Sequence, residues 1–93
     1  MMEIVWSEEA LRNYFKVLDY LFDNWSVKEI ENFENNFDEL IERVKANKEI
    51  CPKSKILNFR KCLIDKNNSL IYQEINGKIF LISLIDNKSL HQY

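Results

Sequence analysis

Residues 57–85 decide the fold, and they read LNFRKCLIDKNNSLIYQEINGKIFLISLI. Three runs in this stretch are rich in the β-branched, aliphatic and aromatic residues that favour strands. They cover residues 57–64, 69–75 and 78–85. Asn76-Gly77 joins the last two runs, and both residues tolerate the positive φ angles of a type I′ hairpin turn. The stretch therefore predicts a three-stranded antiparallel β-meander.

Two helices are predicted before the meander. Ser7 offers an N-cap for the first, and Ser26 with Glu29 forms the pattern of a capping box for the second. Apolar residues then recur at the three- and four-residue steps of an amphipathic helix. In the first helix they are Ala10, Leu11, Tyr14, Phe15, Leu18, Leu21, Phe22 and Trp25, and in the second Val27, Ile30, Phe33, Phe37, Leu40, Ile41 and Val44. The link between the helices is so short that they must form an antiparallel hairpin.

The complete order of elements is β-α-α-β-β-β, because residues 3–6 form a short apolar strand candidate. An isolated strand would leave its backbone groups unpaired, so we expect it to join the same antiparallel sheet. The predicted fold class is α+β, with one domain over residues 1–93. Tyr72 is expected in the core, and Trp6 and Trp25 are expected to act as packing anchors at the two ends of the first helix.

The composition narrows the class of protein. No apolar run approaches the roughly 20 residues that cross a bilayer, and the N-terminus lacks the pattern of a signal peptide. We therefore expect a cytoplasmic protein. Cys51 and Cys62 could pair, but this location favours free thiols. With one histidine and no zinc-type cysteine spacing, neither a metal centre nor a cofactor is expected.

Charge is divided unevenly along the chain. Residues 1–42 hold three bases against eleven acids, a net charge of −8, whereas residues 43–93 hold ten bases against four acids, a net charge of +6. Such an asymmetry suggests a polyanionic or acidic partner for the second half. A solvated acidic face on the helices, balanced by the rest of the chain, explains it equally well.

Four short segments carry a resemblance to a known family. They are Ile4-Val5-Trp6-Ser7-Glu8-Glu9-Ala10, Leu57-Asn58-Phe59-Arg60-Lys61, Leu70-Ile71-Tyr72-Gln73 and Asp86-Asn87-Lys88. Their order, their spacing and the length of the chain resemble the RelE/ParE superfamily, the toxins of bacterial type II toxin–antitoxin modules. The resemblance implies a cognate antitoxin as partner. It implies one of two targets, either DNA gyrase, which ParE-like members inhibit, or the ribosome and its mRNA, which RelE-like members cleave.

The resemblance also implies where the chemistry would lie. Cleaving members cluster basic residues, histidine and tyrosine on the sheet and at the C-terminus, and RNA cleavage needs a proton acceptor, a proton donor and cations. The catalytic candidates are His91, Tyr93, Arg60 and Lys88, and the candidates for contact with the target are Arg60, Lys61, Lys66 and Lys88. Arg60 and Lys61 must point to opposite faces of their strand, so one of them is expected to cover only the sheet edge or the helix side.

Two departures from the cleaving pattern favour the ParE-like branch. Gln92 separates His91 from Tyr93, and Ser69 stands where cleaving relatives carry an arginine. We therefore predict a toxin that inhibits growth by binding. The alternatives are a ribosome-dependent endoribonuclease and a degenerate member without toxicity. Toxicity is predicted to survive loss of His91 and Tyr93 and to weaken when Arg60, Lys61 and Lys88 are neutralised.

Overall fold

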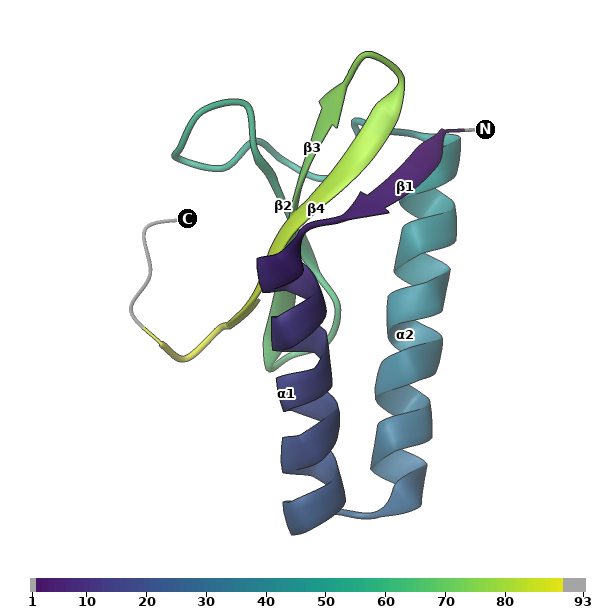
Figure 1. Ribbon diagram of the computed structural model, residues 1–93, viewed down its shortest axis with the longest axis vertical. Coiled ribbons are helices and arrows are strands. Elements are labelled where there is room, and N and C mark those ends of the chain that lie inside the picture. Colours follow the sequence, from purple (N-terminus) through teal and green to yellow (C-terminus); the bar gives the residue numbers. More distant parts are fainter. Residues whose placement is uncertain (1, 90–93) are drawn as a thin grey trace.

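A computed structural model describes residues 2–89 of the chain. Its elements follow the predicted order β-α-α-β-β-β, and Figure 1 shows a helical hairpin beside a twisted sheet. They are β1 (Glu3–Trp6), α1 (Glu8–Asn24), α2 (Val27–Ala46), β2 (Arg60–Leu63), β3 (Asn68–Ile75) and β4 (Lys78–Asp86). The order of strands in the sheet is β1-β4-β3-β2. The predicted α+β class and the predicted meander are confirmed.

The sheet is mixed, not wholly antiparallel. β2, β3 and β4 pair antiparallel as predicted, but β1 pairs parallel with β4, with Ile4 opposite Ile79 and Trp6 opposite Leu81. The expectation of an antiparallel N-terminal strand was wrong. A tight hairpin turn forces its two strands to be antiparallel, whereas β1 and β4 are separated by both helices and two strands, so no turn dictates their relative direction.

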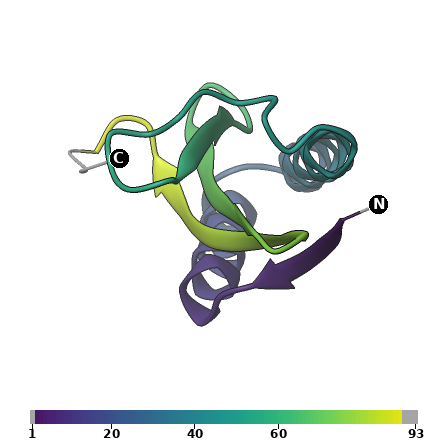
Figure 2. The same cartoon turned by 90° about the horizontal axis from the view of Figure 1, so that it is seen from above.

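The turns of the meander explain where its strands end. Asn76 and Gly77 have φ angles of 50° and 81°, the positive values that the predicted type I′ turn requires. The first strand is shorter than predicted, because it begins at Arg60 and not at residue 57. Leu57 has a φ of 51°, and the Ser54 N–H donates to the Phe59 carbonyl, so residues 54–59 form a loop before β2. This loop projects from the sheet in Figures 1 and 2.

The two helix starts differ in their caps. The Ser7 hydroxyl accepts a hydrogen bond from the Ala10 N–H at 2.9 Å, which confirms the predicted N-cap of α1. Ser26 occupies the N-cap position of α2, but its side chain makes no capping hydrogen bond. The predicted capping box is therefore not formed at the start of the second helix.

One hydrophobic core joins the hairpin to the sheet. The most deeply buried helical side chains line one stripe of each helix, and they pack against residues of β2, β3 and β4. The buried members are Ala10, Phe33, Phe37, Leu40, Val44, Cys62, Ile64, Leu70, Tyr72, Ile79, Leu81 and Leu84. Trp6 is the predicted anchor, with its ring centroid 5.4 Å from those of both Tyr14 and Phe37.

Several residues of the predicted helical core are exposed instead. Their exposures range from 44% to 71%, and they are Leu11, Phe15, Phe22, Trp25 and Val27. Trp25, at 63%, is therefore not a packing anchor. Phe22, Trp25 and Val27 are exposed because the hairpin extends well past the sheet, and its connecting end has no strand beside it (Figure 1). Leu11 and Phe15 lie on a flank of α1 that faces neither α2 nor the sheet.

Asn13 joins α1 to an irregular point in β4. The ladder between β3 and β4 shifts register, so that Ile71 lies opposite Ser83 while Tyr72 lies opposite Leu81. The Asn13 Oδ1 accepts hydrogen bonds from the Ser83 hydroxyl at 3.0 Å and from the Leu84 N–H at 3.1 Å. A β-bulge leaves backbone groups without their ladder partners, and Asn13 satisfies one of them.

We predict that Asn13→Ala lowers the free energy of unfolding by about 1–3 kcal/mol, because it leaves a buried N–H without its acceptor. The measurement is urea unfolding followed by circular dichroism. Asn24→Ala is the matched control, since the Asn24 amide bonds only to the exposed Tyr20 carbonyl of its own helix. That control should change stability by no more than about 0.5 kcal/mol. Equal effects of the two substitutions would contradict the role given to Asn13.

Candidate target-binding surface

β2 carries two of the predicted basic residues on opposite faces of the sheet. Arg60 lies opposite Tyr72, and it shares the helix-facing side with the buried Cys62. Lys61 lies opposite Ile71 and therefore points to the other side. The two side chains therefore lie on opposite faces, as strand alternation predicts, and Lys61 is half-buried on the face away from the helices.

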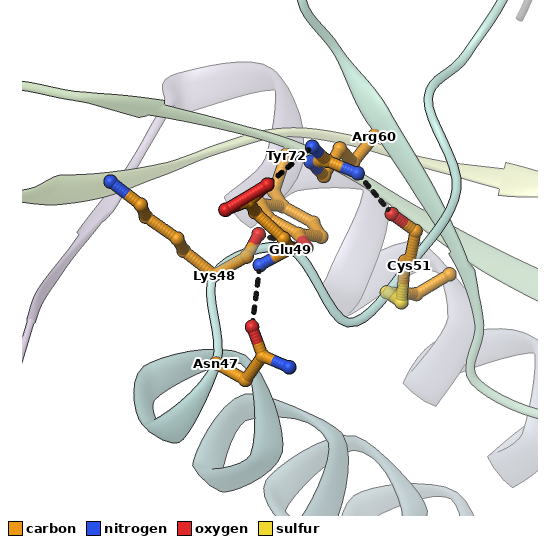
Figure 3. The surroundings of a disulfide bond; sticks show 7 residues. Asn47, Lys48, Glu49, Cys51, Arg60 and Tyr72 are labelled. Atoms are coloured by element: carbon orange, nitrogen blue, oxygen red, sulfur yellow. Dashed lines mark hydrogen bonds and ion pairs between the residues drawn. A yellow bond between two sulfur atoms is a disulfide. The ribbon is translucent and has the colours of Figure 1, made fainter.

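The Arg60 side chain contacts the loop that directly follows the end of α2 at Ala46 and precedes residues 54–59 (Figure 3). Its Nη1 donates to the Cys51 carbonyl at 2.7 Å, and its Nη2 lies 3.6 Å from a carboxylate oxygen of Glu49. The side chain is only 19% exposed. The charge of Arg60 is thus partly balanced, and its planar fork is directed at the protein's own backbone.

Tyr72 lies beneath this loop. Its side chain is fully buried, as predicted, and its hydroxyl donates to the Lys48 carbonyl at 2.7 Å. Burial raises the pKa of the Tyr72 hydroxyl, while a backbone hydrogen bond with Cys51 and the charge of Arg60 act in the opposite direction. The hydroxyl therefore stays protonated near neutral pH and fixes the loop to β3.

Cys51 and Cys62 form a disulfide, with their Cα atoms 5.3 Å apart. The expectation of free thiols was wrong for this structure. Cys62 lies eleven positions after Cys51, but the chain folds back beside β2, where the Lys61 N–H donates to the Pro52 carbonyl at 3.1 Å and Lys53 forms a β-bridge with Arg60. This fold-back brings Cys51 next to the strand that holds Cys62.

Lys66 and Lys88 lie on two turns beyond the far end of β2, and Asn87 ties these turns together. The Asn87 N–H donates to the Asn67 carbonyl at 2.8 Å, and the Asn87 side-chain amide donates to the Lys66 carbonyl at 3.1 Å. The Ser69 hydroxyl donates to the Asn87 Oδ1. Ser69 is fully buried, so its side chain serves this contact and faces no ligand.

The predicted site residues therefore separate into two groups. Arg60 is bound to the loop at one end of β2, whereas Lys66 and Lys88 lie together at the other end, with Lys61 between them on the outer face. Within residues 2–89, no ion pair or hydrogen bond engages the side-chain ammonium group of Lys61, Lys66 or Lys88, although the backbone carbonyl of Lys66 and the backbone N–H of Lys88 accept and donate hydrogen bonds. His91 and Tyr93 lie outside the described residues. The sequence did not predict that Asn87 joins two turns or that Glu49 pairs with Arg60. Asn87 stood out only as part of the segment Asp86-Asn87-Lys88, and no sequence pattern singled out Glu49.

Residues 2–89 contain neither a cluster of metal-ligating side chains nor a membrane-spanning helix. No three histidine, cysteine, aspartate or glutamate side chains in that range gather closely enough to hold a metal ion. No helix there is long and apolar enough to cross a membrane.

Glu74 connects the loop to the β3–β4 turn. One of its carboxylate oxygens lies 3.2 Å from the Lys48 Nζ, and the other accepts the Gly77 N–H at 2.8 Å. The hydrogen bond from Gly77 lowers the pKa of the Glu74 carboxyl, and Lys48 lowers it further. A carboxyl whose pKa is lowered by folding stabilises the folded state above its unfolded pKa, and this contribution disappears as the pH falls through the folded value.

We predict that Glu74→Gln removes this pH dependence. The stability difference between the parent chain and Glu74→Gln should be constant above about pH 5 and should shrink as the pH falls below the ordinary carboxyl pKa of about 4.3. Urea midpoints at several pH values measure it. Glu42→Gln is the control, because Glu42 pairs only with Lys45 on the surface of α2. A difference that grows on acidification would refute this assignment.

Comparisons with known proteins bear on the fold. No sequence-family model matches the chain, and no curated protein sequence matches it. Three solved structures are similar over nearly the whole chain. A copper-bound mutant toxin from Helicobacter pylori has a TM-score of 0.72 at 17% identity and covers 98% of this chain and 100% of its own. A YoeB/ParE toxin from Agrobacterium tumefaciens has a TM-score of 0.67 at 12% identity, and the match covers 92% of this chain and 99% of that toxin.

The third is a YoeB–YefM complex from Staphylococcus aureus, with a TM-score of 0.62 at 16% identity, covering 90% of this chain and 94% of its own. At such identities the likeness concerns the arrangement of the backbone. In each of the three comparisons it covers 90% or more of this chain.

Proposed function

We propose that this chain, whose fold is that of the RelE/ParE superfamily of toxins, is the toxin of a type II toxin–antitoxin module. The observation that carries the proposal is the match in fold over at least 90% of the chain to three toxin structures that come from three different bacteria. Fold alone does not fix function. The surface of the molecule adds two further supports, one for a protein partner and one for the mode of action.

The support for a partner is the apolar surface of the hairpin. Leu11, Phe15 and Phe22 are 44%, 54% and 71% exposed, and their spacing places them along one flank of α1. Trp25 and Val27, 63% and 64% exposed, lie at the end of the hairpin where α1 connects to α2. A soluble monomer rarely exposes so many large apolar residues together, and such patches mark interaction surfaces. We propose that a cognate antitoxin covers this flank.

The support for action by binding comes from the catalytic candidate Arg60 and from Ser69, which stands where cleaving relatives carry an arginine. Arg60 is directed at Cys51 and Glu49, and Ser69 is buried against Asn87. Arg60 is thus occupied by contacts within the protein, and Ser69 carries no charge that could stabilise a phosphorane. The exposed Lys66 and Lys88, with the half-buried Lys61, instead suit contact with an acidic or polyanionic surface. We propose DNA gyrase as the target, in keeping with a ParE-like toxin.

The alternative is a ribosome-dependent endoribonuclease. It would rely on His91 and Tyr93 for proton transfer, and its supporting observation is that Lys88 lies only three residues before His91. In that case Lys88 would supply the cation and the C-terminus would supply the acid and base.

The toxin proposal is tested by controlled expression in a bacterial host, with and without the product of the adjacent gene. Growth should stop when the chain is expressed alone and resume when the neighbour is co-expressed, and the two proteins should copurify. A chain that leaves growth unaffected and binds no neighbouring product would remove the proposal.

Variants of α1 then locate the antitoxin. Leu11→Glu with Phe15→Glu should abolish rescue by the antitoxin while the toxicity remains. Tyr20→Glu is the matched control, because Tyr20 is 59% exposed but lies about half a turn around the helix from Leu11. If Tyr20→Glu abolishes rescue and the double variant does not, the antitoxin covers the other flank.

A further inference from the structure

The segment that follows α2 is attached to β2 and β3 along its length. Three backbone carbonyls of this segment accept hydrogen bonds from the sheet. The Tyr72 hydroxyl donates to Lys48, and the Arg60 guanidinium donates to Cys51. The Lys61 N–H donates to Pro52. The Glu49 carboxylate lies beside Arg60. We call residues 48–53 the edge segment, because the hydrogen bond from Lys61 to Pro52 and the bridge between Lys53 and Arg60 place its end beside β2, at the edge of the sheet.

This position matters because β2 is an edge strand. The strand order leaves β2 paired on one side only, with β3. Unpaired edges offer backbone N–H and C=O groups to any extended chain, and proteins commonly cover them. The edge segment covers the start of β2. There the Pro52 carbonyl accepts a hydrogen bond from the Lys61 N–H, and Lys53 forms a β-bridge with Arg60.

The disulfide is the one covalent link in this cover, and its two ends differ. Cys62 is 2% exposed within the core and belongs to a regular strand, whereas Cys51 is half-buried and belongs to the irregular edge segment. All other attachments are single hydrogen bonds or one of two ion pairs, Lys48 with Glu74 and Glu49 with Arg60, each of which contributes little on its own. The covalent bond therefore holds an otherwise weakly attached segment against a rigid strand.

We propose that the Cys51–Cys62 disulfide is a redox-controlled clamp whose reduction releases the edge segment from β2. Release frees Arg60 from the Cys51 carbonyl and from Glu49, and it exposes the outer edge of β2 at Arg60 and Lys61. This proposal stands whether or not the chain is a toxin. If the toxin proposal also holds, the reduced form gains the unpaired cation of Arg60 and an open strand edge at the start of β2 for its target.

The reductant is a dithiol, either a small molecule or a protein with two adjacent thiols. Its thiolate attacks the Cys51 Sγ, since Cys62 is buried, and the S–S bond breaks as the Cys62 Sγ leaves and takes up a proton. The second thiol of the reductant then displaces Cys51, which also ends as a thiol. Two electrons and two protons pass to the protein, and the reductant becomes a disulfide.

Amide hydrogen exchange of the full chain, with and without dithiothreitol, tests the clamp. The Lys61 amide, which donates to Pro52, should exchange at least about tenfold faster after reduction, because a local opening that was limited by the cross-link becomes accessible. The Ser7 amide, which donates to the Leu81 carbonyl, is the remote control and should be unchanged. The double variant Cys51→Ser with Cys62→Ala should exchange like the reduced chain in either condition.

Three results would overturn the clamp. The first is unchanged exchange at Lys61 after complete reduction, shown by titration of two thiols. The second is equal acceleration at Lys61 and Ser7, because the disulfide would then stabilise the whole fold and not the edge segment. The third is two free thiols after exposure of the folded chain to oxidised glutathione, because the bond would then not form.

Discussion

Phe37→Ala is expected to lower the free energy of unfolding by about 3–5 kcal/mol, the usual cost of removing a buried phenylalanine ring. Phe37 is 3% exposed, and its ring centroid lies 4.9 Å from that of Tyr14 and 5.4 Å from that of Trp6. It therefore joins both helices and β1 in one aromatic cluster. A small domain has a total stability of about 5–15 kcal/mol, so this loss is a large part of the whole.

Phe22→Ala provides the matched control for this prediction, because it deletes the same ring from a position that is 71% exposed. It should change stability by no more than about 0.5 kcal/mol. Chemical unfolding of both variants, followed by circular dichroism, measures the difference. Similar losses from the two substitutions would mean that the end of the hairpin is packed and that its apolar surface is not available to a partner.

If the chain inhibits gyrase as proposed, neutralising Lys61, Lys66 and Lys88 together is expected to weaken that inhibition by about tenfold or more at low salt, because charges at the rim of an interface act mainly on the rate of association. The change is Lys→Gln at each position, and the measurement is the concentration of protein that halves DNA supercoiling. Arg60 is left in place, since its substitution would also disturb the edge segment.

A control with the same change in net charge separates this surface from a general effect. Arg12→Gln, Lys16→Gln and Lys28→Gln remove the three basic residues of the acidic half, and this variant should inhibit as well as the parent chain. Deletion of residues 91–93 should also leave inhibition intact. If the control variant loses as much activity as the lysine variant, the surface assignment is wrong.

Local sequence patterns predicted the elements well because each depends on neighbouring residues. Asn76-Gly77 located the turn, Ser7 located the start of α1, and the three-and-four spacing located both helices. The same patterns predicted too much burial on α1. Periodicity shows that a helix has an apolar stripe, but it does not show how far the sheet extends beside that helix.

The candidate site depended on contacts between residues that are distant in sequence. The chain folds back at Pro52, and no local pattern specifies this. Two contacts follow from it, the disulfide between Cys51 and Cys62 and the hydrogen bond from Arg60 to the Cys51 carbonyl. The parallel direction of β1 has the same origin, since a connection through two helices permits either direction. Strand alternation, in contrast, correctly separated Arg60 from Lys61.

The central proposal is a toxin that acts by binding and not by cutting RNA. Primer extension on cellular mRNA, combined with a supercoiling assay on plasmid DNA from the same induced cells, tests it most directly. We expect growth arrest with relaxed plasmid DNA and intact mRNA. The contradicting result is growth arrest with mRNA cleaved at codons while supercoiling stays normal. If deletion of residues 91–93 abolishes both the growth arrest and the mRNA cleavage, the endoribonuclease is established.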